Sequence, residues 1–70
     1  MNTMAEFKEL IHPDYLGDGL YVAFDGSQIV LAASDGQFLQ HVVYLDSSVL
    51  RSFDNYVKRL TVLLEKEGEK

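Results

Sequence analysis

The sequence contains no cysteine, so a chain of 70 residues has neither a disulfide bridge nor a thiolate metal ligand available to it. Small secreted domains usually depend on disulfides, and their absence favours a reducing compartment such as the cytoplasm. Two histidines are too few for a metal site built from imidazole alone. We therefore expect no metal site and no cofactor.

Basic residues are also scarce, because six lysines and arginines face eleven acids and the net charge is −5. The excess lies in residues 1–50, where seven acids and one base, Lys8, give −6, whereas residues 51–70 contain four acids and five bases. Binding to DNA or RNA needs a basic surface, so we expect no direct nucleic-acid contact. A partner protein with a basic surface is favoured instead.

Long apolar runs are missing as well. The uninterrupted ones are only a few residues long, far below the ~20 that cross a bilayer. The N-terminal stretch MNTMAEFKEL has acids where a signal peptide has bases. These features predict a single soluble cytoplasmic domain, residues 1–70, with no membrane contact.

A short helix is predicted at the N-terminus. Thr3 and Glu6 have the spacing of a capping box, and His12-Pro13 ends the helix because the residue before a proline is disfavoured in the α region. Apolar residues then fall on one side of the helix at Met4, Phe7, Leu10 and Ile11.

Three strands are predicted next. Apolar residues alternate in Leu20–Asp25, and Asp25-Gly26 favours a two-residue hairpin turn that places Val22 opposite Ile29. At the second turn, a three-residue loop ending in Gly36 is favoured over a two-residue turn. The longer loop aligns Leu39, Val43 and Leu45 with Ile29 and Leu31 and leaves His41 at the rim of the same face.

A long helix follows from Asp46-Ser47-Ser48 to about Lys66, with Gly68 beyond its end. Its broad apolar stripe, typical of a helix that covers a sheet, comprises Val49, Leu50, Phe53, Tyr56, Val57, Leu60, Leu63 and Leu64. The predicted fold is therefore α+β with the order α-β-β-β-α. A three-stranded antiparallel meander carries the long C-terminal helix across one face, with Phe53, Val57 and Leu60 buried against Val22, Ile29 and Leu31.

Aspartates mark nearly every predicted turn. The four candidates for partner contact are Asp14, Asp18, Asp25 and Asp35. Turn chemistry alone explains residues of this type beside glycine. A meander nevertheless collects these turns at the two ends of the sheet, with Asp14 and Asp18 near the Asp35 end, so the carboxylates also form acidic rims that a basic partner could bind.

The outer face of the predicted sheet lacks charge. It comprises Tyr21, Ala23, Gln28, Val30, Ala32, Phe38, Gln40, Val42 and Tyr44. A solvated face normally carries polar residues, so this one is expected to be covered. Three covers remain open: the first helix through Phe7 and Ile11, a second copy of the chain, or a foreign protein. Tyr21 and Tyr44 are the candidate contact residues.

No catalytic constellation is recognisable. His12 reads as a helix end and His41 as a strand residue, while Ser47 and Ser48 read as helix caps. Gly17-Asp18-Gly19 lacks the further glycines, the lysine and the following helix of a phosphate-binding loop. We therefore expect no catalytic residue and no enzymatic activity.

The stretch YLGDGLYVAFDGSQIVL resembles a "YLGDGVYASFDG" segment of small proteins from bacteria, prophages and phages. The resemblance covers about residues 14–50 and departs at Leu20, where the pattern has valine. It implies a mobile-element origin in a bacterial host cell. It implies no activity, so no functional residue is carried over.

Composition and resemblance together predict a small acidic, non-enzymatic binding protein. It would inhibit or modulate a host nucleic-acid-handling protein by presenting carboxylates where phosphates would lie, as some anti-CRISPR proteins do. The alternative is a small self-associating domain whose outer sheet face forms a homodimer and whose aspartates only make turns.

Overall fold

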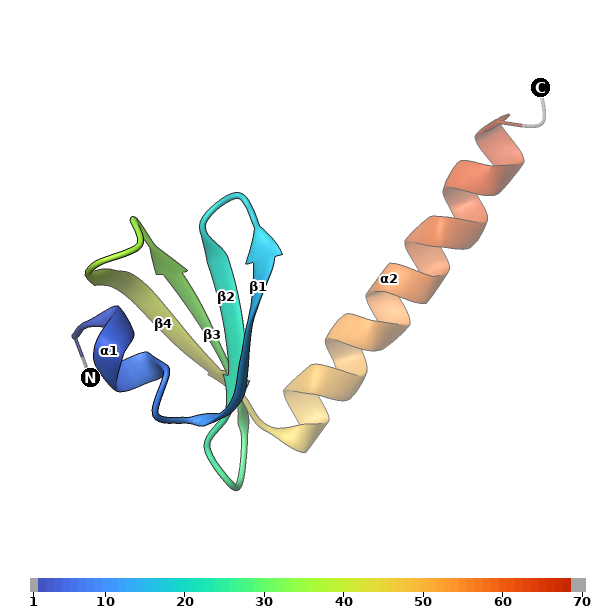
Figure 1. Ribbon diagram of the computed structural model, residues 1–70. Coiled ribbons are helices and arrows are strands. Elements are labelled where there is room, and N and C mark those ends of the chain that lie inside the picture. Colours follow the sequence, from blue (N-terminus) through green and yellow to red (C-terminus); the bar gives the residue numbers. More distant parts are fainter. Residues whose placement is uncertain (1, 69–70) are drawn as a thin grey trace.

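A computed structural model describes residues 2–68, in which an antiparallel sheet of four strands is flanked by two helices (Figure 1). The elements in chain order are α1 (Met4–Phe7), β1 (Ile11–Gly17), β2 (Leu20–Phe24), β3 (Ile29–Ser34), β4 (Leu39–Leu45) and α2 (Ser47–Gly68). Strands that follow one another in the chain are neighbours in the sheet. The α+β class and the antiparallel meander are confirmed, but the order is α-β-β-β-β-α.

The strand absent from the prediction is β1. It pairs with β2 through Ile11 opposite Phe24 and Asp14 opposite Val22, with register irregularities on both sides of the Asp14–Tyr15 segment. His12 has a positive φ of 49° and precedes Pro13, which has no N–H to donate. The sequence predicts a helix end at His12-Pro13, whereas the structure continues through these residues as the edge strand β1.

Helix α1 is a single turn held by its cap. The Oγ1 atom of Thr3 accepts a hydrogen bond from the backbone N–H of Glu6 at 3.3 Å. The Oε1 atom of Glu6 accepts in return from the backbone N–H of Asn2 and from the Thr3 hydroxyl, both at 3.2 Å. These two bonds, the Asn2 bond first, lower the pKa of Glu6. The predicted capping pair is confirmed, although the helix ends at Phe7.

The core lies between α1 and one face of the sheet. Its buried members are Met4, Phe7, Ala23, Val30 and Ala32, and the partly buried Leu10, Tyr21, Leu39 and Val42 pack against them. The first helix, the first of the three covers considered, thus covers part of the outer face of the predicted sheet, while Phe38, Gln40 and Tyr44 stay exposed. Met4 and Phe7 provide the contact, whereas Ile11 lies in β1 and is exposed.

The β2–β3 connection has four residues instead of two. Phe24 pairs with Ile29 and Val22 with Leu31, which shifts the predicted register by two residues. Because side chains alternate with a period of two, this shift leaves every residue on its predicted face. The backbone N–H of Asp25 donates to the carbonyl of Gln28 at 3.1 Å and closes the loop.

The β3–β4 connection is longer than the predicted three-residue loop, which would place Leu39 opposite Leu31, so the register differs from the prediction by four residues. Leu31 pairs with Val43 and Ile29 with Leu45. A register shift between Ala33 and Ser34 changes the other end, so that Leu39 packs into the core beneath α1 and does not join Val43. The buried Ser34 hydroxyl donates to the carbonyl of Phe38 at 2.7 Å and stabilises this irregular turn.

Helix α2 does not lie across the sheet of its own chain. Figure 1 shows it leaving the end of β4 and extending away from the sheet, and none of its described residues is buried. Phe53 is 52% exposed and Leu60 37% exposed, so their predicted burial within the chain is wrong. Only Asp46 separates β4 from α2. A helix that folds back onto the sheet of the preceding strand is usually connected to that strand by about two to six residues.

The N-terminal segment lies beside the start of β4. The carbonyl of Asn2 accepts a hydrogen bond from the Leu39 N–H at 2.9 Å, and the Met4 N–H donates to the carbonyl of Gln37 at 3.0 Å. Thr3 and Phe38 form a β-bridge between these two bonds. Residues 2–4 are therefore hydrogen-bonded to one edge of the sheet, while the irregular β1 forms the other edge.

Candidate functional site

Asp25 and Asp35 lie in turns, as expected from the sequence, although each connection has four residues and is longer than predicted. The Oδ1 atom of Asp25 accepts from the backbone N–H groups of Ser27 at 2.8 Å and Gln28 at 2.6 Å. Asp35 accepts in the same way from Gln37 and Phe38, both at 2.9 Å. Donated N–H bonds favour the ionised carboxylate, so the pKa of each aspartate is lowered, chiefly by the Gln28 bond to Asp25 and the Phe38 bond to Asp35. Both carboxylates are therefore charged at neutral pH.

The other two candidate aspartates differ in position. Asp14 lies within β1, where its Oδ1 atom accepts from the backbone N–H of Tyr15 at 2.8 Å. Asp18 lies in the β1–β2 turn with a φ of 52°. The Ser34 N–H donates to the carbonyl of Gly19 at 2.9 Å, which places this turn next to the turn containing Asp35. The structure therefore brings Asp18 and Asp35 to one end of the sheet.

Asp25 lies at the opposite end, beside the start of α2, so the four carboxylates do not form one cluster. All four residues are exposed. Their distribution agrees with two acidic rims, although Asp14 belongs to an edge strand and not to a turn. Each rim can therefore present its carboxylates to a basic partner, but the four carboxylates do not line one binding cavity.

The two candidate tyrosines have different environments. Tyr21 is half-buried between Phe7, whose ring centroid is 6.3 Å away, and Tyr15, whose centroid is 4.7 Å away. Tyr44 is 49% exposed. Tyr44 is thus available to a partner, whereas Tyr21 belongs to the aromatic packing beneath α1. The Tyr15 hydroxyl also accepts from the Gly19 N–H at 3.1 Å, a role that the sequence does not reveal.

A shallow pocket of about 380 Å³ lies between α1 and β1. Its lining consists of Met4, Phe7, Lys8, Pro13, Asp14, Tyr15 and Tyr21. Lys8 and Asp14 are exposed and provide the only charges of this lining. Within residues 2–68, no three histidine, aspartate or glutamate side chains group closely enough to hold a metal ion.

The face of the sheet opposite α1, here called the open face, is apolar and uncovered. It comprises Leu20, Val22, Phe24, Ile29, Leu31, Ala33, His41, Val43 and Leu45. Phe24 is 39% exposed and Val43 is 52% exposed, while Leu45 is buried where the chain passes into α2. A monomer in water would leave this surface hydrated at a free-energy cost of ~25 cal/mol for each Å² of apolar area.

A second uncovered apolar surface is the stripe along α2, here called the α2 stripe. It comprises Val49, Leu50, Phe53, Tyr56, Val57, Leu60, Leu63 and Leu64, and all of these except the half-buried Leu50 are exposed. The sequence predicted this stripe correctly. It did not reveal that the stripe and the open face are unpartnered within one chain.

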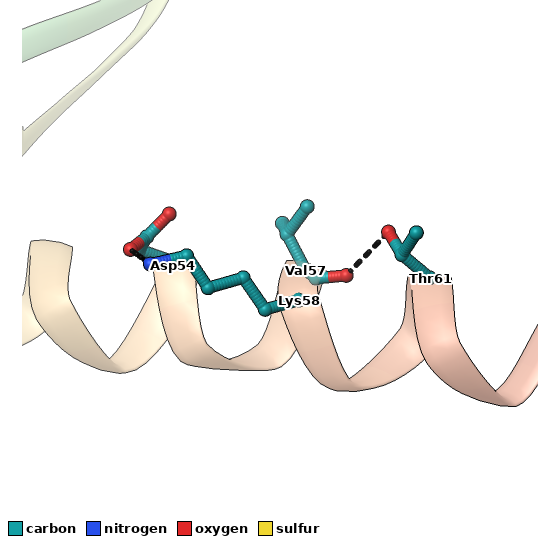
Figure 2. A network of polar contacts seen from close by, with 4 residues as sticks. All are labelled: Asp54, Val57, Lys58 and Thr61. Carbon is teal, nitrogen blue, oxygen red and sulfur yellow. Dashed lines mark hydrogen bonds and ion pairs between the residues drawn. The ribbon is translucent and has the colours of Figure 1, made fainter.

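The polar side chains of α2 interact within the helix. Figure 2 shows Lys58 reaching back along the helix to Asp54, with an Nζ–Oδ2 distance of 2.8 Å, and the Thr61 hydroxyl donating to the carbonyl of Val57 at 2.8 Å. The Asp54 carboxylate raises the pKa of Lys58 through this contact. These bonds support the helix without tying it to the sheet, so the direction of α2 depends on its junction with β4.

The chain matches no family model, no curated protein and no solved structure. Among residues 2–68, neither helix combines the length and apolar character needed to pass through a lipid bilayer. Arguments about function therefore depend on the chain's own surfaces: the acidic rims, the open face and the α2 stripe.

Proposed function

We propose that this protein is a non-enzymatic protein–protein interaction domain that works as a homodimer. The observation that carries the proposal is the exposure of the α2 stripe together with the partly exposed open face on a chain of 70 residues. Contiguous apolar patches of this kind on a folded protein mark interfaces. A second copy of the chain is always present and carries both surfaces, so it is the partner that we propose.

The exposed area supports this proposal quantitatively. The accessible surface is 5375 Å², whereas a folded monomer of this mass exposes about 4,400 Å². The radius of gyration is 14.8 Å, compared with about 11 Å for a compact domain of this length. Burying the excess of about 1,000 Å² on each of two chains gives roughly 2,000 Å², the size of a stable dimer interface.

Sedimentation equilibrium or light scattering over a wide concentration range tests the proposal. The expected mass is twice the 7.9 kDa of one chain at micromolar concentration. Apolar interfaces do not weaken as salt screens charge, so the dimer is expected to persist at high ionic strength. A mass of one chain at every concentration would show that the protein is not a homodimer.

A second candidate function is supported by the charge distribution. Residues 1–46, which form α1 and the sheet, contain seven acids and one base, and the carboxylates of Asp14, Asp18, Asp25 and Asp35 are exposed. Such a body is suited to bind a basic surface of a host protein, including one that otherwise binds nucleic acid. In this second proposal, the protein inhibits or modulates such a host protein in the bacterial cytoplasm through contact with its acidic residues. A homodimer would present two acidic bodies to it.

A further inference from the structure

We infer that the α2 helix of each copy lies across the open face of the other copy, so that two chains exchange their C-terminal helices. The inference rests on the homodimer proposed above and adds which surfaces meet. The stripe–sheet contact predicted from the sequence would then form, but between two chains.

The junction between β4 and α2 keeps the helix from its own sheet. Asp46 is the single connecting residue and also the cap: its Oδ1 atom accepts from the Val49 N–H at 2.8 Å, and its carbonyl accepts from the Leu50 N–H at 2.9 Å. Folding α2 back would need a longer connection or the loss of this cap. A second copy meets no such restriction, and short connections of this kind favour exchange of elements between chains.

The dimensions and the apolar pattern of α2 fit a sheet. Its 22 residues span about 33 Å, while four strands spaced about 4.8 Å apart make a face roughly 15–20 Å wide. Adjacent apolar pairs, Tyr56-Val57 and Leu63-Leu64, make the stripe broader than the narrow seam of a coiled coil. The stripe is therefore better matched to the open face than to a second α2.

The charges of the two parts are also complementary. The body, residues 1–46, has a net charge of −6, from seven acids and one base. In α2, four bases exceed three acids, and the net charge is +1. Contact between the body of one copy and the α2 helix of the other joins opposite net charges, whereas pairing of two α2 helices joins like charges.

Cross-linking of single-cysteine variants tests the exchange, because the chain has no cysteine of its own. Val43→Cys places a thiol on the open face and Phe53→Cys places one in the α2 stripe. The two variants are unfolded together, refolded as a mixture and treated with a short bismaleimide, and the products are identified by mass spectrometry. The expected product joins the Val43→Cys chain to the Phe53→Cys chain, which only contact between copies can give.

Asn55→Cys, on the side of α2 opposite Phe53, is the matched control and should give little mixed product with Val43→Cys. Circular dichroism checks that each variant keeps its helix and strand content, and Leu60→Cys replaces Phe53→Cys if the latter does not fold. A dimer that links Phe53→Cys to itself, or gives no mixed product, overturns the exchange but leaves the homodimer intact. A monomer overturns both.

Discussion

The rings of Phe7 and Tyr21 meet edge to face, with centroids 6.3 Å apart and an interplanar angle of 69°. Phe7 is 0% exposed, although it comes from a helix of only four residues. This contact joins α1 to the sheet and completes the core on that side. A single helical turn persists here because it is packed, since short helices are unstable alone.

The first prediction concerns that core. Phe7→Ala should lower the free energy of unfolding by about 3–5 kcal/mol, because it removes a fully buried ring. Phe38→Ala is the matched control, since Phe38 is 52% exposed, and should cost much less. Urea denaturation followed by circular dichroism compares the two. Equal midpoints would contradict the packing of α1 on the sheet.

The second prediction concerns the α2 stripe. Phe53 is 52% exposed in the chain, so Phe53→Ala should leave the secondary structure in place. If the stripe is the dimer contact, the substitution should raise the dimer dissociation constant about tenfold or more, as loss of a large interface anchor does. Asn55→Ala on the opposite side of α2 should leave that constant unchanged. Sedimentation equilibrium measures both, and equal constants would remove Phe53 from the interface.

The third prediction concerns the β2–β3 loop. Gly26 has a φ of 100°, a conformation that a β-branched residue strongly disfavours, and no atom lies within 4 Å of the Cβ it would acquire. Gly26→Val should therefore destabilise the protein by roughly 1–3 kcal/mol through backbone strain alone. The positive φ of Gly26 and Gly36 agrees with the turns predicted from sequence. Thermal unfolding checks the cost, with Gly68→Val at the helix end as the control.

The fourth prediction concerns pH. Backbone N–H donors lower the pKa of Asp25 and Asp35 in the folded state, so the folded protein binds fewer protons than the unfolded chain in the acidic range. Their stabilisation is present above the unfolded pKa of about 3.9 and is lost as the pH falls through the lower folded values. The Tm should drop below about pH 4. In Asp25→Asn with Asp35→Asn this drop should be smaller, and an identical drop would contradict the role of the two carboxylates.

The fifth prediction separates turn formation from partner binding. Replacing Asp14, Asp18, Asp25 and Asp35 by asparagine should keep the fold, because asparagine accepts the same turn hydrogen bonds. The neutralised protein should lose affinity for a basic partner, mainly through a slower association rate. Surface plasmon resonance at low and high salt measures this against an isolated host target. Unchanged rates in a folded variant would leave the aspartates with a structural role only.

Local sequence signals predicted much of the fold. The Thr3–Glu6 cap, the Asp46 start of α2 and the glycines at positions 26 and 36 are all readable from short-range chemistry. The β2–β3 register was wrong by two residues, yet the faces were right because strand periodicity is two. Strand β1 was not predicted because His12-Pro13 was interpreted as the end of the first helix, and the strand has no alternating apolar pattern.

The position of α2 could not be read from its apolar stripe. Periodicity shows that a helix has an apolar side, but not which surface covers it. The feature that limits the position of α2 is the length of its connection, because Leu45 ends β4 and Ser47 already begins α2. Among the candidate site residues, the turn aspartates were placed well because their hydrogen bonds are local. The burial of Tyr21 beneath Phe7 was less accessible, because it depends on a contact between distant segments.

The two edges of the sheet affect whether copies of this chain can add to one another through strand pairing. At one edge, Pro13, the charge of Asp14 and the irregular register of β1 interrupt the ladder, and at the other, residues 2–4 occupy hydrogen-bonding groups of early β4. Edges broken in this way are poor templates for strand addition, the route by which small β-proteins grow into fibrils. Apolar surface of this extent would otherwise be an aggregation hazard. The interruptions along β1 and at the start of β4 would therefore favour the face contacts of the proposed homodimer over edge-to-edge growth.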